Sequence, residues 1–163
     1  MAQPDYAKAQ SLAESIISDY QITDPVVPVH DIAATKGLSI KVIPMPEKLK
    51  GVSGFFDPKE KTIYVNGDDV PRRQMFTVAH ELGHFLLEHD PKEYGVLLRF
   101  PEVNGKDASE QEANCFAANL LVPELMLRDV MKKYSLTKEH LSTLAKLFGV
   151  SKAVMRYRLE RME

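Results

Sequence analysis

Residues 76–87 read FTVAHELGHFLL, a run in which two histidines and a glutamate interrupt apolar side chains. Glutamate is almost never fully buried unless it is paired, and histidine is only intermediate in its preference for the interior. The apolar residues around them follow a helical period. Asp68 or Asp69 can cap this helix, Pro71 suits its first turn, and we expect it to run to about His89. The run thus predicts a buried helix whose three polar groups share a partner.

His80 and His84 are four residues apart, which places both imidazoles on one face of a helix. Two nitrogens so placed can bind one metal ion, and the adjacent Glu81 can transfer a proton. This is the HExxH arrangement of zinc proteases. The alternative is a core helix whose two histidines are satisfied by protein groups. The helical context favours the first interpretation, so we predict Zn²⁺ bound by His80 and His84, with Glu81 as the catalytic residue.

A catalytic zinc site usually has three protein ligands and one open position. Asp90 lies six residues after His84, but extended zinc motifs need a turning glycine midway, where this chain has Leu87. His89 has the wrong spacing and is expected on the far side of the helix end. Neither residue is therefore the expected third ligand.

The segment 109–123, SEQEANCFAANLLVP, offers a better third ligand in Glu112, which begins an apolar face at helical spacing. A carboxylate on the inner side of a helix needs a partner, and a metal supplies one. Glu110 is the rival, but it lies about two hundred degrees round the helix and fits an exposed first-turn residue. Cys115 could be a soft ligand, although a small buried hydrophobe suits it better. We predict His80, His84 and Glu112 as the metal ligands.

The rest of the chain predicts an α+β fold with a small antiparallel sheet, a zincin-like active-site helix and a C-terminal helical bundle. We expect one domain over residues 1–163, with a helix pair at about 135–163 packed on it and joined at Gly149 and Val150. The other expected elements are helices at 6–20, 29–36, 110–121 and 123–134, a strand at 38–44, a hairpin of strands 51–57 and 62–66, and a short strand at 95–100.

Composition narrows the function classes. The chain has 163 residues and a net charge of −2, which argues against a protein coated in positive charge for nucleic acid. No apolar run is long enough to span a bilayer, and the N-terminal residues lack the apolar core of a secretion signal. Cys115 is the single cysteine, so no internal disulfide can form. We expect a cytoplasmic protein without a membrane partner. The composition does not specify an oligomeric state.

Several motifs together resemble the ImmA/IrrE family of zinc metallo-endopeptidases. VAHELGH (78–84) looks like the active-site helix of that family, and EQEANCFAANLLVP (110–123) is similar to its second signature. In that signature a glutamate ahead of Ala-Asn/Asp-x-Phe-Ala is the third zinc ligand, which would be Glu112. The resemblance runs from about Ala7 to Arg161, and one departure is Met75, where members often carry arginine. The other similar segments are 25–40, 64–77 and 144–159.

The resemblance implies regulated proteolysis of one protein, typically a helix-turn-helix repressor encoded nearby, in a phage, mobile element, stress response or toxin–antitoxin-like pair. The function expected on this basis is a zinc-dependent endopeptidase in which Glu81 acts as general base. The candidates for a second group that stabilises the oxyanion are His89, Tyr94 and Arg99.

Two other classes of protein compete with this prediction. The C-terminal pair has a helix-turn-helix look, since Gly149 allows a turn and Ser151 can cap a basic helix, so a DNA-binding regulator is one alternative. A partner-binding module with a non-catalytic metal site is the other, although metal binding alone would not require Glu81. We favour an amphipathic pair with a solvated basic face and expect no specific DNA binding by this chain alone; the basic residues are Lys152, Arg156, Arg158 and Arg161.

Overall fold

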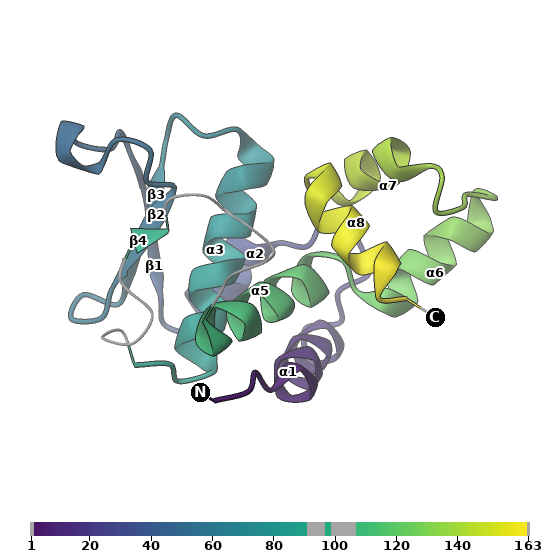
Figure 1. The fold of residues 1–163 in the computed structure, drawn as a ribbon, viewed down its shortest axis with the longest axis horizontal. Coiled ribbons are helices and arrows are strands. Elements are labelled where there is room, and N and C mark those ends of the chain that lie inside the picture. Colours follow the sequence, from purple (N-terminus) through teal and green to yellow (C-terminus); the bar gives the residue numbers. More distant parts are fainter. Residues whose placement is uncertain (1, 91–96, 99–106, 163) are drawn as a thin grey trace.

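A computed structural model describes residues 2–90, 97–98 and 107–162. Helices and a small sheet occupy separate parts of the molecule, which confirms the α+β class (Figure 1). No helix in the described ranges is both long and apolar enough to span a membrane. The elements are α1 (Tyr6–Asp19), α2 (Val29–Thr35), β1 (Ser39–Ile43), η1 (Glu47–Leu49), β2 (Gly54–Asp57), β3 (Thr62–Asn66), α3 (Pro71–Leu86), β4 (Leu97–Leu98), α5 (Ala108–Leu121), α6 (Glu124–Lys133), α7 (Leu141–Phe148) and α8 (Lys152–Glu160).

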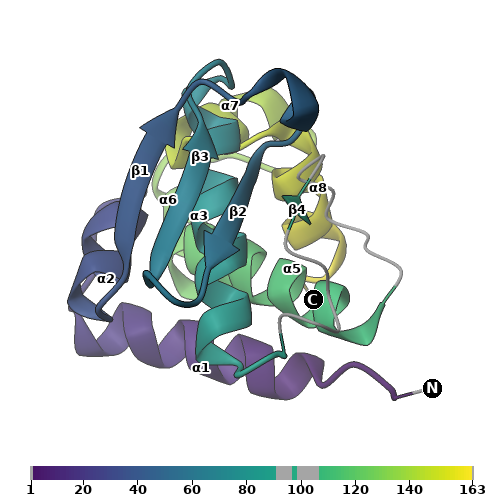
Figure 2. The ribbon, with the colours of Figure 1, turned by 90° about the vertical axis from the view of Figure 1, so that its left-hand side faces the viewer.

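The sheet has the strand order β1-β3-β2-β4 (Figure 2). Strands β2 and β3 form the expected antiparallel hairpin, and Oδ1 of Asp57 accepts a hydrogen bond from the Lys59 amide at 2.9 Å in its turn. Strand β4 pairs antiparallel with β2. Strand β1, however, runs parallel to β3, so the sheet is mixed rather than antiparallel. The alternating pattern predicts that a strand exists, but pairing direction depends on the path of the connection 44–53.

Helix α3 is buried on all sides over nine consecutive residues, 76–84, because it lies between the sheet and α5 (Figure 2). Pro71 occupies its first turn as expected. The N-cap is Val70, and neither Asp68 nor Asp69 caps the helix with its side chain, so the prediction of an aspartate cap is wrong. Gln74 ties down the approach to the helix instead, because its Nε2 donates to the carbonyl oxygens of Asn66 and Asp69.

Helices α3 and α5 approach each other closely at Gly83. A Cβ atom built there would lie 2.8 Å from Cδ1 of Phe116 and 3.3 Å from the carbonyl oxygen of Ala113, so a larger residue would force the helices apart. A glycine inside a helix costs about 1 kcal/mol relative to alanine. Close packing at this position offsets that cost and brings the first turn of α5 near the histidines.

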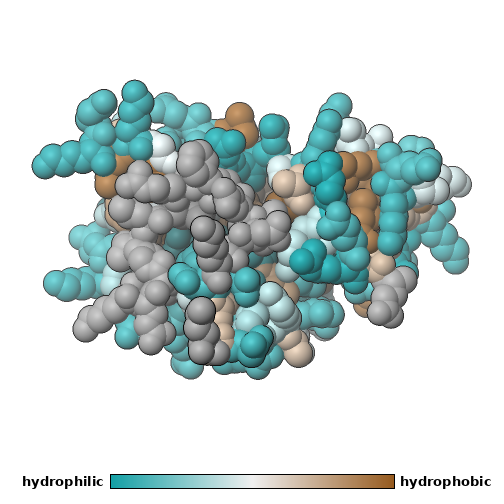
Figure 3. Space-filling model, viewed as in Figure 1, coloured by the Kyte–Doolittle hydropathy of each residue, from teal (hydrophilic) through white to brown (hydrophobic). Residues whose placement is uncertain are grey.

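The C-terminal pair α7–α8 turns at Gly149, which has a φ of 67°, and Oγ of Ser151 caps α8 by accepting from the Val154 amide at 3.2 Å. Nε of Arg158 is buried and donates to the carbonyl oxygen of Val122 at 2.9 Å, which fastens α8 to the end of α5. Arg158 is therefore not part of a solvated basic face, contrary to expectation. The guanidinium of Arg161 lies 3.6 Å from the ring centroid of Tyr157. In Figure 3 the described surface is mostly hydrophilic, with small hydrophobic areas over the C-terminal helices.

Candidate metal centre

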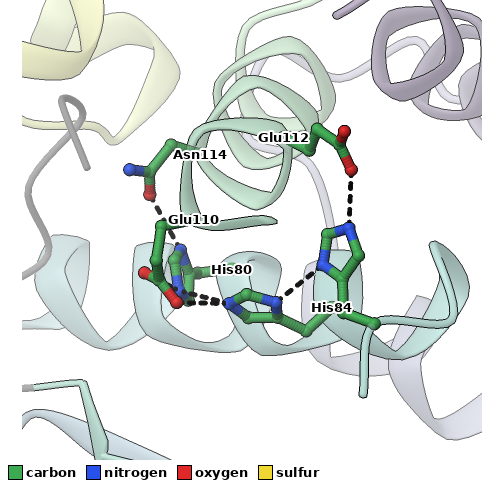
Figure 4. A network of polar contacts seen from close by, with 6 residues as sticks. His80, His84, Glu110, Glu112 and Asn114 are labelled. Atoms are coloured by element: carbon green, nitrogen blue, oxygen red, sulfur yellow. Dashed lines mark hydrogen bonds and ion pairs between the residues drawn. The ribbon is translucent and has the colours of Figure 1, made fainter. Parts of the chain in front are cut away.

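Three side chains from two helices converge on one point. Nε2 of His84 lies 3.1 Å from Nε2 of His80 and 2.9 Å from Oε1 of Glu110, and Nε2 of His80 lies 3.3 Å from Oε2 of Glu110 (Figure 4). Both imidazoles are buried, and the Glu110 side chain is 21% exposed. In the part of the chain that the structure describes, these three residues form the one group of histidine, cysteine or acidic side chains close enough to hold a metal ion together.

The carboxylate that the structure places beside the two histidines is that of Glu110, and not that of Glu112 as expected from the sequence. Oε2 of Glu112 instead lies 2.7 Å from Nε2 of His89, and its Oε1 accepts a hydrogen bond from the Asp5 amide at 2.8 Å. Helix α5 is buried along residues 113–121, so its apolar pattern does not distinguish the face toward α3 from the face toward α1. The side that faces α3 begins at Glu110 and continues through Ala113 and Asn114, which lie one turn further on.

Asn114 orients His80 from the same side of α5. Its Oδ1 lies 2.8 Å from Nδ1 of His80, in the buried interior. An amide oxygen can only accept a hydrogen bond, so Nδ1 of His80 donates and Nε2 carries the lone pair when the ring is neutral. A ligand histidine is commonly held in this way by a second group that fixes its tautomer. No ligand spacing in the sequence points to Asn114, although its place one turn after Glu110 puts it on the same face of the helix.

Glu81 lies fully within the protein, with 2% of its surface exposed, and its Oε2 atom has no hydrogen-bond partner among the described residues. Burial raises the pKa of its carboxyl from 4.5 to about 7, against the opposing charge of His80, and the nearby charge of Glu110 raises it further. A general acid or base works best with a pKa near the working pH. Glu81 therefore has both the position and the proton affinity for transferring protons beside the two histidines.

The charges of the three converging groups are strongly linked. Burial lowers the pKa of His84 to about 4 despite its hydrogen bond to Glu110. Burial also opposes charge on His80, but the hydrogen bond and charge of Glu110, with the charge of Glu81, raise its pKa overall. Burial disfavours the Glu110 anion too, yet the two histidines lower its pKa to about 2. The carboxylate is thus ionised and attracts a positive charge, which a proton or a metal cation can supply.

The donor set fits a divalent cation such as zinc. Two imidazole nitrogens and a carboxylate are common zinc ligands at about 2.0–2.1 Å, and tetrahedral geometry then places neighbouring donors roughly 3.3 Å apart. The three separations here are 3.1, 2.9 and 3.3 Å. Oε2 of Glu81, for which the described residues supply no partner, belongs to a carboxyl group that interacts with the charges of His80 and Glu110. His80, His84 and Glu110 would therefore hold the cation with little rearrangement of the backbone.

The donor set does not include Cys115, Asp90 or His89. Cys115 is buried, and its thiol donates to the carbonyl oxygen of Tyr6 at 3.8 Å, which agrees with the role of a small buried hydrophobe. Asp90 is not part of the group. His89 does not lie on the far side of the helix end, because its Nδ1 is 2.8 Å from Nδ1 of His84. Tyr94 and Arg99 fall outside the described residues.

Fold and site together define an α+β protein with a buried His-His-carboxylate group, carried by one helix and completed by a second. The chain belongs to the Peptidase_M78 family, because residues 35–160 match the family model described as the IrrE N-terminal-like domain. This match confirms the resemblance to the ImmA/IrrE family that the sequence motifs indicate.

Similarity to two individual relatives supports this family assignment. The chain is 28% identical to the radiation response metalloprotease IrrE of Deinococcus radiodurans over 155 residues, 94% of this chain and 46% of that protein. It is 28% identical over 157 residues to the protein of the same name from Deinococcus deserti, covering 94% of this chain and 54% of that protein. The chain thus spans about half the length of these two relatives.

A shorter relative comes from a phage. The chain is 27% identical over 147 residues to uncharacterized immunity region protein 2 of Bacillus phage phi105, covering 89% of this chain and 85% of that protein. A solved Mycobacterium tuberculosis transcriptional regulator has the same fold, with a TM-score of 0.69 and 16% identity, over 94% of this chain and 46% of that chain. At that identity the likeness concerns the fold alone.

Proposed function

We propose that this chain is a zinc-dependent endopeptidase in which His80, His84 and Glu110 hold the metal and Glu81 is the catalytic residue. The convergence of three ligand atoms beside a buried glutamate is the observation that carries the proposal. Membership of a peptidase family and similarity to two proteins named metalloproteases support it. A site that only bound a metal would have no need to bury a carboxylate oxygen to which the described residues offer no hydrogen bond, at a cost of about 1–3 kcal/mol.

When bound, a zinc ion polarises the carbonyl of a peptide bond and lowers the pKa of water to about 7. Glu81 supplies the proton transfer. Its carboxylate accepts a proton from the attacking water, and the resulting carboxylic acid donates that proton to the amine that leaves. A pKa of about 7 suits both directions of transfer near neutrality. Asn114 keeps the lone pair of His80 Nε2 directed at the metal position throughout.

For the substrate we propose a specific protein, with a helix-turn-helix transcriptional repressor encoded nearby as the leading candidate. The similarity to a protein from a phage immunity region supports this choice, since that phage protein is matched over most of its length. The ImmA/IrrE family resemblance implies the same class of substrate. We place this activity in the cytoplasm, where such a repressor works.

The decisive experiment compares the wild-type chain with Glu81→Gln on the candidate repressor, using mass spectrometry to follow cleavage and metal analysis to follow zinc. We expect Glu81→Gln to retain zinc and to lose cleavage by at least about 100-fold, the usual contribution of a general base. Cleavage at the wild-type rate by Glu81→Gln would reject the mechanism. Absence of zinc from wild-type protein purified without chelators would reject the metal site itself.

A further inference from the structure

We propose that His89 and Glu112 are positioning residues that hold His84 in the one tautomer able to bind a metal through Nε2. The inference rests on the proposed metal site and adds a role for two residues that lie outside its donor set. Three contacts in series carry it: Glu112 Oε2 to His89 Nε2 at 2.7 Å, His89 Nδ1 to His84 Nδ1 at 2.8 Å, and His84 Nε2 to Glu110 Oε1 at 2.9 Å.

The direction of the hydrogen bonds follows from which atoms can donate. A carboxylate oxygen accepts, so Nε2 of His89 donates to Oε2 of Glu112. When a metal occupies Nε2 of His84, the proton of that ring lies on Nδ1, so Nδ1 of His84 donates to Nδ1 of His89. The lone pair of His84 is then on Nε2, the atom that faces His80 and Glu110, where a metal takes the place of the proton in the hydrogen bond to Glu110.

The backbone after α3 is folded so that His89 can make this contact. Glu88 has a φ of 58°, in the left-handed region, and its amide donates to the Phe85 carbonyl oxygen at 3.2 Å. The His89 amide donates to the His84 carbonyl oxygen at 3.0 Å. These are the two hydrogen bonds of a Schellman motif, which ends a helix by reversing the chain. The reversal returns the His89 ring to the side of His84.

Glu112 is fixed independently of His89. The Asp5 amide donates to its other oxygen at 2.8 Å, and Asp5 itself caps α1 by accepting from the Lys8 amide at 2.9 Å. The carboxylate is therefore held between the start of α1 and the end of α3. Figure 4 shows Glu112 on the opposite side of the network from Glu110, although both belong to α5. Glu110 thus contacts Nε2 of His84 directly, and Glu112 reaches Nδ1 of His84 through His89.

The test measures zinc affinity by competition with a chromophoric chelator in four proteins: wild type, Glu112→Ala, Glu112→Gln and Glu139→Ala. Loss of a group that orients a ligand histidine typically weakens metal affinity by about 10- to 100-fold, and we expect this for Glu112→Ala. Glu112→Gln retains an oxygen that can accept from His89, so most of the affinity should return. Glu139 is exposed in the turn before α7, and its alanine variant should bind zinc as wild type does.

The tautomers themselves are read by ¹⁵N NMR of the zinc-loaded wild-type protein. We expect a proton on Nδ1 of His84, a proton on Nε2 but not on Nδ1 of His89, and a scalar coupling between the two Nδ1 atoms. A merely structural role for Glu112 would not fix the proton of His89, so Glu112→Ala should give a mixture of His89 tautomers. If that variant does not fold, the wild-type spectrum and the zinc affinity of Glu112→Gln still test the inference.

A proton on Nδ1 of His89 in the zinc-loaded protein would overturn the inference, as would wild-type affinity in Glu112→Ala together with an unchanged His89 spectrum. Both results are compatible with a working metal site. If wild-type protein binds no zinc, the proposed function fails first, so the two failures are distinguishable.

Discussion

Oε1 of Glu110, in the first turn of α5, lies 2.9 Å from Nε2 of His84, in the last turn of α3. This contact joins the two helices at the candidate metal site, and Gly83 allows them to come close enough to make it.

Replacing Glu110 by alanine should remove one of three metal ligands. We expect zinc affinity to fall by more than about 100-fold, a larger loss than the removal of an orienting group causes. Metal analysis after dialysis against a weak chelator measures the effect, with Glu139→Ala as the control. Full zinc occupancy in Glu110→Ala, with loss in Glu112→Ala, would return the ligand assignment to Glu112.

The metal-free protein should lose stability as pH rises because of Glu81. Its carboxyl keeps a proton up to about pH 7 when folded, whereas its ordinary pKa is 4.5. Between these values the folded state binds more protons than the unfolded state, so the free energy of unfolding falls with rising pH, by about 3 kcal/mol in total. Glu81→Gln lacks this ionisation. In chemical denaturation with a chelator present, the free energy of unfolding of the wild type should decrease relative to that of Glu81→Gln as pH rises from about 4.5 to 7. A constant difference across that range would contradict the buried carboxyl.

Substituting alanine for Gly83 should separate α3 from α5. The added Cβ meets a buried ring of Phe116 and the backbone at Ala113, and such overpacking typically costs about 1–3 kcal/mol. The gain in helix propensity, about 1 kcal/mol, offsets part of that cost. We expect a net loss of stability in thermal unfolding and weaker zinc binding, while Arg72→Ala on the exposed start of α3 changes neither. A more stable Gly83→Ala protein with full zinc affinity would show that the close approach is unnecessary.

Glu88 should tolerate glycine better than any β-branched residue. Its φ of 58° costs an L-residue roughly 1–2 kcal/mol, whereas glycine adopts this conformation freely. The entropy that glycine adds to the unfolded chain offsets about 0.4–1 kcal/mol of the gain. Thermal unfolding should therefore rank Glu88→Gly at or above wild type and Glu88→Val below it. The reverse order would mean that the Schellman turn does not form.

The C-terminal pair should not bind DNA specifically. Arg158 is buried and donates to the Val122 carbonyl oxygen, which leaves Lys152 and Arg156 as the exposed cations of α8. Arg161, directly after the helix, is also exposed and lies over Tyr157. Contacts made by so few charges are weak and decline steeply with salt. Gel retardation at low salt should vanish near physiological salt and show no preference among DNA sequences. A footprint that persists at that salt without a partner would favour the DNA-binding alternative.

Local sequence determines much of the secondary structure of this protein. The period of the apolar residues and the positions of proline and glycine predict most helices, the hairpin and the turn at Gly149, because each depends on neighbouring residues alone. The spacing of His80 and His84 likewise places two imidazoles on one helical face whatever surrounds them.

Tertiary structure decided which carboxylate joins those imidazoles. Helix α5 is buried nearly all round, so its apolar pattern gives no preferred face, and the angle at which it packs on α3 selects Glu110. The same packing directs Glu112 to His89, which the left-handed turn at Glu88 has brought back to His84. The direction of β1 was also decided at this level. Each of these features depends on contacts between segments far apart in the chain, whose relative orientation no local pattern specifies.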